Sequence, residues 1–232
     1  MADPRRAAAA LARAIREAGD LVIPVDCVVC RRAPGPVCAR CARDLVPAPA
    51  SIARLAGGAP IVVGAMHTGA VAAVLRAIKD EARPGLVRHL GPLLAAALAT
   101  LARDVDAAAS TLTPVTVPGT RRSDRARGFR VTDRCCRVIG VAPHRALALV
   151  RQPGDQRGLD RDERVANVAA SMRARDVAGR RIVIVDDVVT TGATLAEAAR
   201  AVTAAGGLVV GAAAVSATPR HGGPRGGHGG RG

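Results

Sequence analysis

Aromatic side chains are almost missing from this sequence of 232 residues. There is no Trp and no Tyr, and Phe129 is the one aromatic residue. Lysine is nearly missing too, because Lys79 stands among 34 cationic residues that are otherwise arginines. Sequence-tolerant binding of nucleobases commonly depends on stacking against aromatic rings. The composition therefore excludes a binding mode built on a platform of aromatic side chains.

Long apolar runs are missing as well. No run reaches the roughly 18 uncharged apolar residues that a membrane span needs, and the most apolar stretch, residues 90–102, is too short. Arg13, Arg16 and Glu17 interrupt the apolar region near the N-terminus, which argues against a signal peptide. We therefore expect a cytoplasmic protein without a membrane span, whose cysteines are reduced.

The formal net charge of the chain is +15. Such an excess favours polyanionic partners, namely nucleic acid, phosphates or an anionic membrane surface. A compositional bias toward Arg, Ala, Gly and Val over the whole chain is the alternative explanation. The distribution is more informative than the total, because residues 118–181 contain 16 arginines and 7 acidic residues.

The apolar pattern predicts an α/β domain over residues 60–216, with a mainly parallel sheet flanked by helices. Strand-like runs occupy residues 61–63, 112–117, 181–185 and 208–215, and helical spacing occurs at residues 71–78, 86–101 and 194–205. Strands that alternate with helices are typical of parallel sheets. Outside this domain we expect an N-terminal helix (residues 1–20), a cysteine module (residues 21–49) and a disordered Gly/Arg tail (residues 217–232).

The cysteine module contains two Cys-x2-Cys pairs separated by seven residues: Cys27, Cys30, Cys38 and Cys41. Two such pairs can close a tetrahedral thiolate site, which suits structural zinc. Redox-active thiols and chance clustering are the alternatives. Cys135 and Cys136 are adjacent and cannot both point at one site from a helix, so we expect ordinary buried thiols there.

Residues 182–195 join a buried strand, an acidic pair and a loop of small residues that opens a helix. Asp186 and Asp187 come directly after the apolar run. Open α/β sheets bind ligands outside the carboxyl ends of their strands, and adjacent carboxylates can accept hydrogen bonds from vicinal hydroxyls. A small loop at a helix N-terminus can hold a phosphate through its N–H groups, with further donors from Thr190, Thr191 and Thr194. The pattern predicts a sugar-phosphate site, and an ordinary strand–turn–helix is the alternative.

This run closely resembles the phosphoribosyl-pyrophosphate (PRPP) motif of type I phosphoribosyltransferases. Two further motifs accompany it: Arg121-Arg122-x5-Gly128-Phe129 and Gln156-x2-Leu159-x4-Arg164-x2-Asn167. Together with the four-cysteine module they are similar to the ComF family of competence-associated, phosphoribosyltransferase-like proteins. The resemblance covers about residues 21–216.

The resemblance implies a type I phosphoribosyltransferase fold with PRPP as ligand and Mg²⁺ bridging PRPP oxygens. It implies that the catalytic pair Asp186 and Asp187 binds the ribose hydroxyls. The 5′-phosphate would be held by Thr190, Thr191, Gly192, Ala193 and Thr194. Pyrophosphate would be held by the loop of residues 119–127, and residues 151–167 would close over it. Guanidinium groups match phosphate oxygens well, so the candidates are Arg121, Arg125, Arg127 and Arg164, to which the resemblance adds Asn167.

The chain departs from the family pattern at two positions. His67 stands where members often have an aromatic residue, and we expect this change to affect packing only. Arg130-Val131 replaces Asn-Gln, and Arg130, Arg134 and Arg137 recur at helical spacing, which predicts a solvated face. Lys79 resembles a family position, but the sequence assigns it no role.

Two functions are consistent with these motifs. The first is an enzyme that transfers phosphoribose from PRPP to an unidentified nitrogen acceptor through an oxocarbenium-like transition state, although no general base is evident. The second is a non-enzymatic component of competence and DNA uptake that binds single-stranded DNA through its basic surface and zinc module. Without aromatic stacking, such binding would depend on phosphate contacts and therefore steeply on salt.

Overall fold

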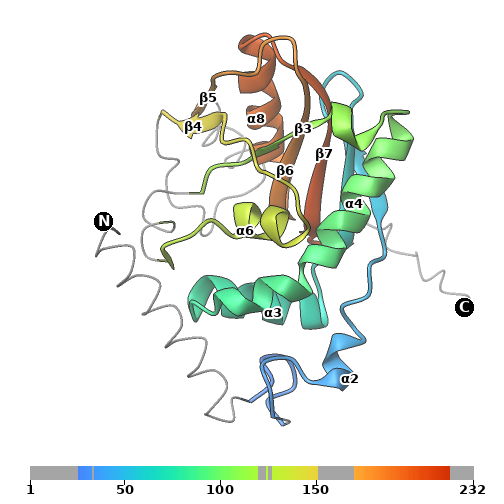
Figure 1. The fold of residues 1–232 in the computed structure, drawn as a ribbon, viewed down its shortest axis with the longest axis vertical. Coiled ribbons are helices and arrows are strands. Elements are labelled where there is room, and N and C mark those ends of the chain that lie inside the picture. Colours follow the sequence, from blue (N-terminus) through green and yellow to red (C-terminus); the bar gives the residue numbers. More distant parts are fainter. Residues whose placement is uncertain (1–25, 33, 120–123, 125–126, 151–169, 220–232) are drawn as a thin grey trace, which may run out of the picture.

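Five strands form the central sheet in the computed structural model, which describes residues 26–32, 34–119, 124, 127–150 and 170–219. The sheet order is β1-β2-β7-β6-β3 (Figure 1). The strands are β1 (Ala50–Arg54), β2 (Pro60–Met66), β3 (Thr113–Thr116), β6 (Arg181–Val189) and β7 (Leu208–Ala217). All neighbours pair in parallel except β1, which is antiparallel to β2. The expected mainly parallel α/β sheet is confirmed.

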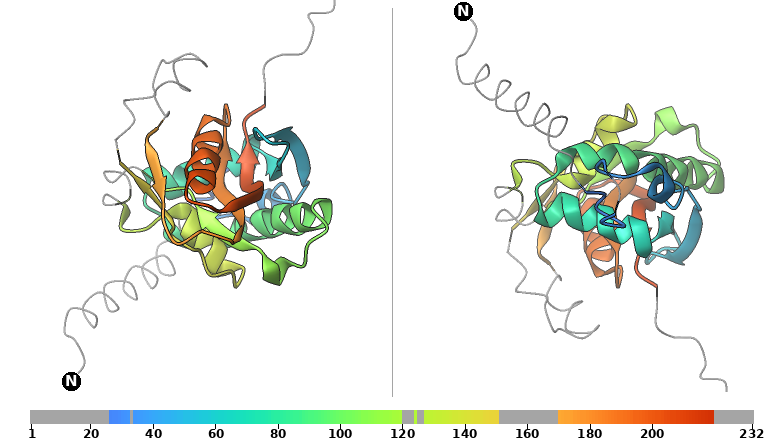
Figure 2. Two further views of the ribbon diagram at one scale, coloured as in Figure 1. Left: turned by 90° about the horizontal axis from the view of Figure 1, so that it is seen from above. Right: turned by 90° about the horizontal axis from the view of Figure 1, so that it is seen from below.

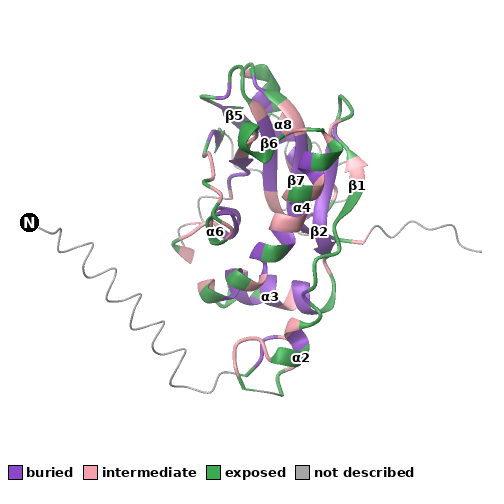
Figure 3. Ribbon diagram, turned by 45° about the vertical axis from the view of Figure 1, so that its right-hand side comes forward, coloured by how far each residue is buried: buried purple, intermediate pink, exposed green. Residues whose placement is uncertain are grey.

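Both faces of the sheet are covered, so its inner strands are apolar on both sides (Figure 3). In one row across the four parallel strands, Val115 pairs with Ile184, Ile184 with Ala212, and Ala212 with Ile61. These residues belong to the core beneath helix α8 (Ala193–Ala204). A two-stranded ribbon of β4 (Leu147–Leu149) and β5 (Met172–Ala174) packs on the same helix. The alternate residues Val183 and Val185 face the opposite core.

The opposite core lies beneath α3 (Gly69–Asp80), the 3-10 helix η1 (Pro84–His89), α4 (Gly91–Asp104) and α6 (Val131–Val138). Their apolar faces follow from helical spacing, as when Val71, Val74 and Ile78 turn inward from α3. The helix expected over residues 86–101 is divided at Leu90, where η1 ends and α4 begins with Pro92 in its first turn.

The segment Pro84–Asp104 is long and apolar enough, by length and composition, to cross a membrane. Its apolar side chains are used in another way, because Leu93, Leu94 and Leu101 are fully buried and α4 packs on β2 and β7. This packing is that of a core helix in a folded domain.

A buried carboxylate joins α6 to the sheet. Asp133 accepts hydrogen bonds from the Thr116 hydroxyl (2.7 Å) and from Nε of Arg145 (2.6 Å). The side chain of Asp133 is 1% exposed, and a buried charge is tolerated only when it is paired and hydrogen-bonded. The pairing therefore fixes α6 directly behind the loop that follows β3.

The cysteine module packs against α3 (Figures 1 and 2). Its described residues contain one short helix, α2 (Ala39–Ala42). Val28 and Leu45 belong to the same core cluster as α3, and Arg31 forms an ion pair with Glu81 just after that helix (3.3 Å). The module is thus attached to the domain by apolar contacts as well as by a surface ion pair. The expected helix over residues 1–20 lies outside the described residues, as does the tail beyond residue 219.

Gly64 allows the close approach of α4 to β2, because a Cβ at this position would overlap the Leu93 carbonyl group. We expect Gly64→Ala to lower the free energy of unfolding by about 3 kcal/mol, since backbone must move to accept the methyl group. Gly85→Ala is the matched control, because its nearest neighbour would be a flexible Arg88 side chain at 3.7 Å. Urea unfolding measures both, and equal midpoints for the two variants would contradict the assignment.

Candidate functional site

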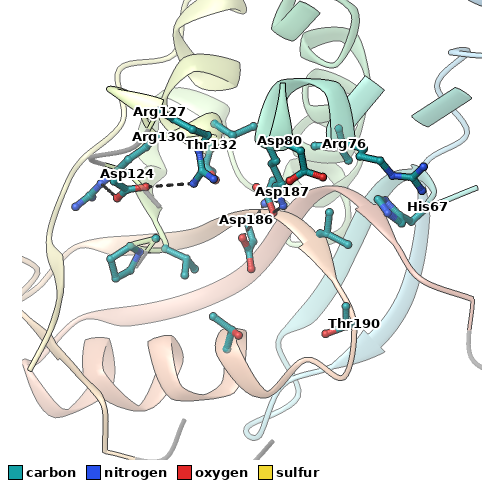
Figure 4. Close-up of a pocket in the computed structure, with 18 of the residues that line it drawn as sticks. His67, Arg76, Asp80, Asp124, Arg127, Arg130, Thr132, Asp186, Asp187 and Thr190 are labelled. Atoms are coloured by element: carbon teal, nitrogen blue, oxygen red, sulfur yellow. Dashed lines mark hydrogen bonds and ion pairs between the residues drawn. The ribbon is translucent and has the colours of Figure 1, made fainter. Parts of the chain in front are cut away.

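A pocket of about 600 Å³ opens at the carboxyl ends of the parallel strands (Figure 4). Open α/β sheets place their ligand sites at this edge because the loops after the strands meet there. The polar side chains that line it come from the ends of β2 and β7, α3, the loop after β3, α6, β6 and the turn into α8: His67, Arg76, Lys79, Asp80, Asp124, Arg127, Arg130, Thr132, Asp186, Asp187, Thr190, Thr194 and Thr218. Figure 4 shows Asp186 and Asp187 between the Asp124–Arg130 group and His67.

The acidic pair lies at the centre of this pocket. Strand β6 continues to Val189, so Asp186 and Asp187 belong to the strand and do not follow it as the sequence suggested. The Asp187 N–H donates a hydrogen bond to Oδ1 of Asp186 (2.8 Å). Desolvation raises the pKa of Asp186 to about 7, and the charge of Asp187 is the second cause of this increase. Two adjacent carboxylates in one partly buried site therefore resist full ionisation.

Lys79 provides the counter-charge. Its Nζ lies 2.9 Å from Oδ1 and 2.9 Å from Oδ2 of Asp187. The two side chains are 32% and 18% exposed, so the pair is only partly screened by water. Sequence reasoning noticed Lys79 as the one lysine but could not place it, because 108 residues separate the two partners.

The loop after β6 turns sharply into α8. Gly192 has a φ of +85°, a conformation that glycine adopts without strain, and it precedes the first residue of α8. Thr190 and Thr194 line the pocket, whereas the Thr191 hydroxyl accepts a hydrogen bond from the Ala193 N–H (3.3 Å). A helix N-terminus of this kind can bind an anionic group.

Two arginines lie across the pocket from this loop. Asp124 pairs with Nε of Arg130 (3.0 Å) and with Nη2 of Arg127 (3.6 Å). Nε of Arg127 and Nη1 of Arg130 are buried and have no hydrogen-bond partner among the described residues. Both arginines line the pocket, and guanidinium groups match the oxygens of an anion well.

The expected solvated face of Arg130, Arg134 and Arg137 is wrong for Arg130. Helix α6 begins at Val131, so Arg130 precedes the helix in extended conformation and lines the pocket, with a side chain 28% exposed. Arg137 is exposed as expected, and the guanidinium of Arg134 lies 5.3 Å from the centre of the Phe129 ring. Of the expected pyrophosphate candidates, Arg127 lines the pocket, and the rest lie outside the described residues: Arg121, Arg125, Arg164 and Asn167.

His67 also lines the pocket, where the sequence suggested a packing role only. Its Nδ1 lies 3.0 Å from the hydroxyl of Ser216, which is fully buried on β7. Burial and the nearby charge of Lys79 lower the pKa of His67. The imidazole is therefore neutral near pH 7 and held by the ends of two neighbouring strands.

The four cysteines of the module converge on one point. Their Sγ atoms all lie within 4.8 Å of one another, and those of Cys30 and Cys38 are 3.9 Å apart. Zn–S bonds of about 2.3 Å in a tetrahedron place sulfurs about 3.8 Å apart, so the cluster fits a metal ion of this kind. Desolvation raises the pKa of Cys27, but backbone N–H groups outweigh it and lower that pKa to about 6, which favours a thiolate. Cys135 and Cys136 are buried in α6, as expected.

Comparison with known proteins agrees with this geometry. Residues 144–226 match the phosphoribosyl transferase domain family. An adenine phosphoribosyltransferase from Synechococcus sp. (strain CC9902) is 30% identical over 149 residues, which cover 62% of this chain and 83% of that protein. A parallel sheet with a polar pocket at its carboxyl edge defines an α/β protein built to hold a small ligand. The chain belongs to the phosphoribosyltransferase family, and a PRPP-using, transferase-type function follows from that membership.

The raised pKa of Asp186 leads to a prediction about the stability of the fold. The pKa of Asp186 is about 7 in the folded chain, above the ordinary value of 3.8, so this carboxyl costs the fold more stability as the pH rises from about 4 to about 7. Asn cannot ionise. Asp186→Asn should therefore unfold about 3 °C or more above wild type at pH 8, and the difference should shrink toward pH 5.

Thermal unfolding followed by circular dichroism measures this dependence. Asp104→Asn is the control, since Asp104 is an exposed acid at the end of α4, and its difference from wild type should be the same at both pH values. A difference between Asp186→Asn and wild type that grows toward pH 5 would refute the assignment.

Proposed function

We propose that the chain is a ComF-type phosphoribosyltransferase that binds PRPP with Mg²⁺ in this pocket and transfers phosphoribose to a nitrogen acceptor. The observation that carries the proposal is the arrangement around Asp186 and Asp187. The acidic pair lies between the Arg127 and Arg130 side chains on one side and the small loop before α8 on the other. Each part suits a different group of one ligand.

The carboxylates of Asp186 and Asp187 accept hydrogen bonds from the ribose 2′- and 3′-hydroxyls. The loop from Thr190 to Thr194 holds the 5′-phosphate through N–H groups at the start of α8. Arg127 and Arg130 bind the pyrophosphate, whose oxygens match planar guanidinium donors. Bound to PRPP oxygens, Mg²⁺ would neutralise part of the pyrophosphate charge.

The reaction breaks the bond between C1 of the ribose and the pyrophosphate oxygen. The bonding electrons leave with the pyrophosphate, and positive charge develops on the ribose as in an oxocarbenium ion. Arg127 and Arg130 stabilise the negative charge that grows on the leaving group. The acceptor nitrogen then forms the new bond to C1 and loses a proton, for which we assign no base.

The ComF assignment is supported by the cysteine module. Its core residues Val28 and Leu45 pack with α3, the helix that brings Lys79 to the pocket. We propose that its metal is a structural zinc ion, since four thiolates leave no open position for catalysis.

A second candidate is a non-enzymatic role in DNA uptake. Four exposed arginines favour it, all on the cysteine module: Arg31, Arg32, Arg40 and Arg43. Arg31 is paired with Glu81, and phosphate groups could contact the exposed guanidinium groups of the other three. In this case PRPP would act as a bound signal and the module as the DNA contact.

Binding of PRPP tests the site itself. Wild-type protein should bind PRPP in the presence of Mg²⁺, measured by isothermal titration calorimetry. Asp186→Asn/Asp187→Asn should weaken binding about 100-fold, because two hydrogen bonds to charged acceptors are lost. The control is Asp104→Asn/Asp106→Asn, which removes two exposed acids at the far end of α4 and should keep wild-type affinity.

Pyrophosphate release then separates the two candidates. The assay uses a panel of purine and pyrimidine bases that includes adenine, and a reaction without acceptor. Turnover on any base supports the transferase. Tight PRPP binding without turnover, together with salt-dependent binding of single-stranded DNA, supports the second candidate. No PRPP binding by wild type, or equal affinity of the double Asn variant, would refute both uses of the pocket.

Elemental analysis should find about one zinc ion per chain. Cys38→Ser should lose most of the zinc and unfold at a lower temperature, because the metal closes a segment with few core residues. Cys136→Ser is the matched control, since this cysteine lies in α6 outside the cluster, and it should keep its zinc. Zinc-free wild type would contradict the assignment.

A further inference from the structure

Lys79 contacts the carboxylate that the proposed function assigns to the ribose. Its ammonium lies 2.9 Å from both oxygens of Asp187, and the side chain lines the same pocket. From this geometry we propose that Lys79 is a positioning residue, which orients and neutralises Asp187 so that the acidic pair can accept the ribose hydroxyls. The inference rests on the proposed function and adds a residue to it.

Both partners stand on rigid elements. Lys79 lies in the last turn of α3, directly after Ile78, which is fully buried. Asp187 follows Val183 and Val185 on β6, and these residues share one core cluster with α3. The distance between the ammonium and the carboxylate is therefore determined by core packing and not by a mobile loop.

Charged and titratable groups from several elements surround the pair: Asp186 from β6, His67 after β2, Arg76 and Asp80 from α3, and Cys135 from α6. The charge of Asp187 raises the pKa of Asp186, His67 and Cys135, and the charge of Lys79 lowers all three. Lys79 therefore offsets the effect of Asp187 on the pKa of Asp186, His67 and Cys135.

A lysine suits this position better than the arginine used elsewhere in the chain. Arginine presents a planar fork that engages both oxygens of a carboxylate side by side. The ammonium also contacts both oxygens of Asp187, but it is a smaller group than a guanidinium and leaves more of the pocket free beside them. This difference in size gives a physical reason for one lysine among 34 cationic residues.

A double-mutant cycle tests the coupling. The variants are Lys79→Met, Asp187→Asn and the two combined, and the readout is PRPP affinity with Mg²⁺. Lys79→Met alone should weaken binding about tenfold, and should add little when Asp187 is already Asn. The pH at which affinity falls to half should also be higher in Lys79→Met than in wild type, because the acidic pair holds its proton more tightly without the ammonium.

The matched control is Arg88→Met, which removes one positive charge from an exposed side chain outside the residues that line the pocket. Its effect should add to that of Asp187→Asn, and its pH profile should stay close to that of wild type. If the effects of Lys79→Met and Asp187→Asn were additive, Lys79 would act on another part of the ligand and the proposal would be wrong.

Chemical modification tests the contact in the intact protein. Since Lys79 is the one lysine, reductive methylation followed by mass spectrometry reports on its side chain alone, with the terminal amine as reference. Methylation should be several-fold slower in wild type than in Asp187→Asn, and equal rates would refute the contact. Wild type that fails to bind PRPP overturns the proposed function, whereas binding with an additive cycle overturns the role of Lys79 alone.

Discussion

The parallel sheet is the constraint on which the rest of the structure depends. Because β2, β7, β6 and β3 run in the same direction, their carboxyl ends meet at one edge, and the loops that follow them share one pocket. Both faces must be buried for such a sheet to be stable. The helices α3, α4 and α6 cover one face and α8 covers the other, so the acidic pair on β6 and Lys79 on α3 are attached to packed elements.

The pocket combines charges that would repel one another if they were alone. Two adjacent carboxylates stand at its centre, and desolvation opposes the ionisation of Asp186. Lys79 offsets the charge of Asp187, and Asp124 partly occupies Arg127 and Arg130. Strain of this kind is common at functional sites, where groups are arranged for a ligand and cost stability in its absence. Electrostatics and fold are linked here through α3, which contributes to the core and brings the lysine to the acid.

Local signals predicted much of the fold. Alternating strand and helix patterns identified the parallel domain, and two Cys-x2-Cys pairs identified the cluster of sulfurs. The sequence missed the antiparallel edge strand Ala50–Arg54 and the short ribbon of β4 and β5, because short strands with few apolar residues have weak periodicity. Arg130 was misplaced for a related reason, since helical spacing does not reveal that the helix begins one residue later.

By itself the sequence determined the chemistry that is contiguous along the chain: the acidic pair, the small threonine-rich loop and the cysteine spacing. Each of these depends on neighbours a few residues apart, so the order of residues is enough to place them. Tertiary structure alone decided which distant side chains complete the site. Lys79 reaches Asp187, His67 reaches Ser216, and Arg130 turns inward because the sheet brings separate loops to one edge. No local pattern records such contacts, since they are created by core packing between elements more than 100 residues apart.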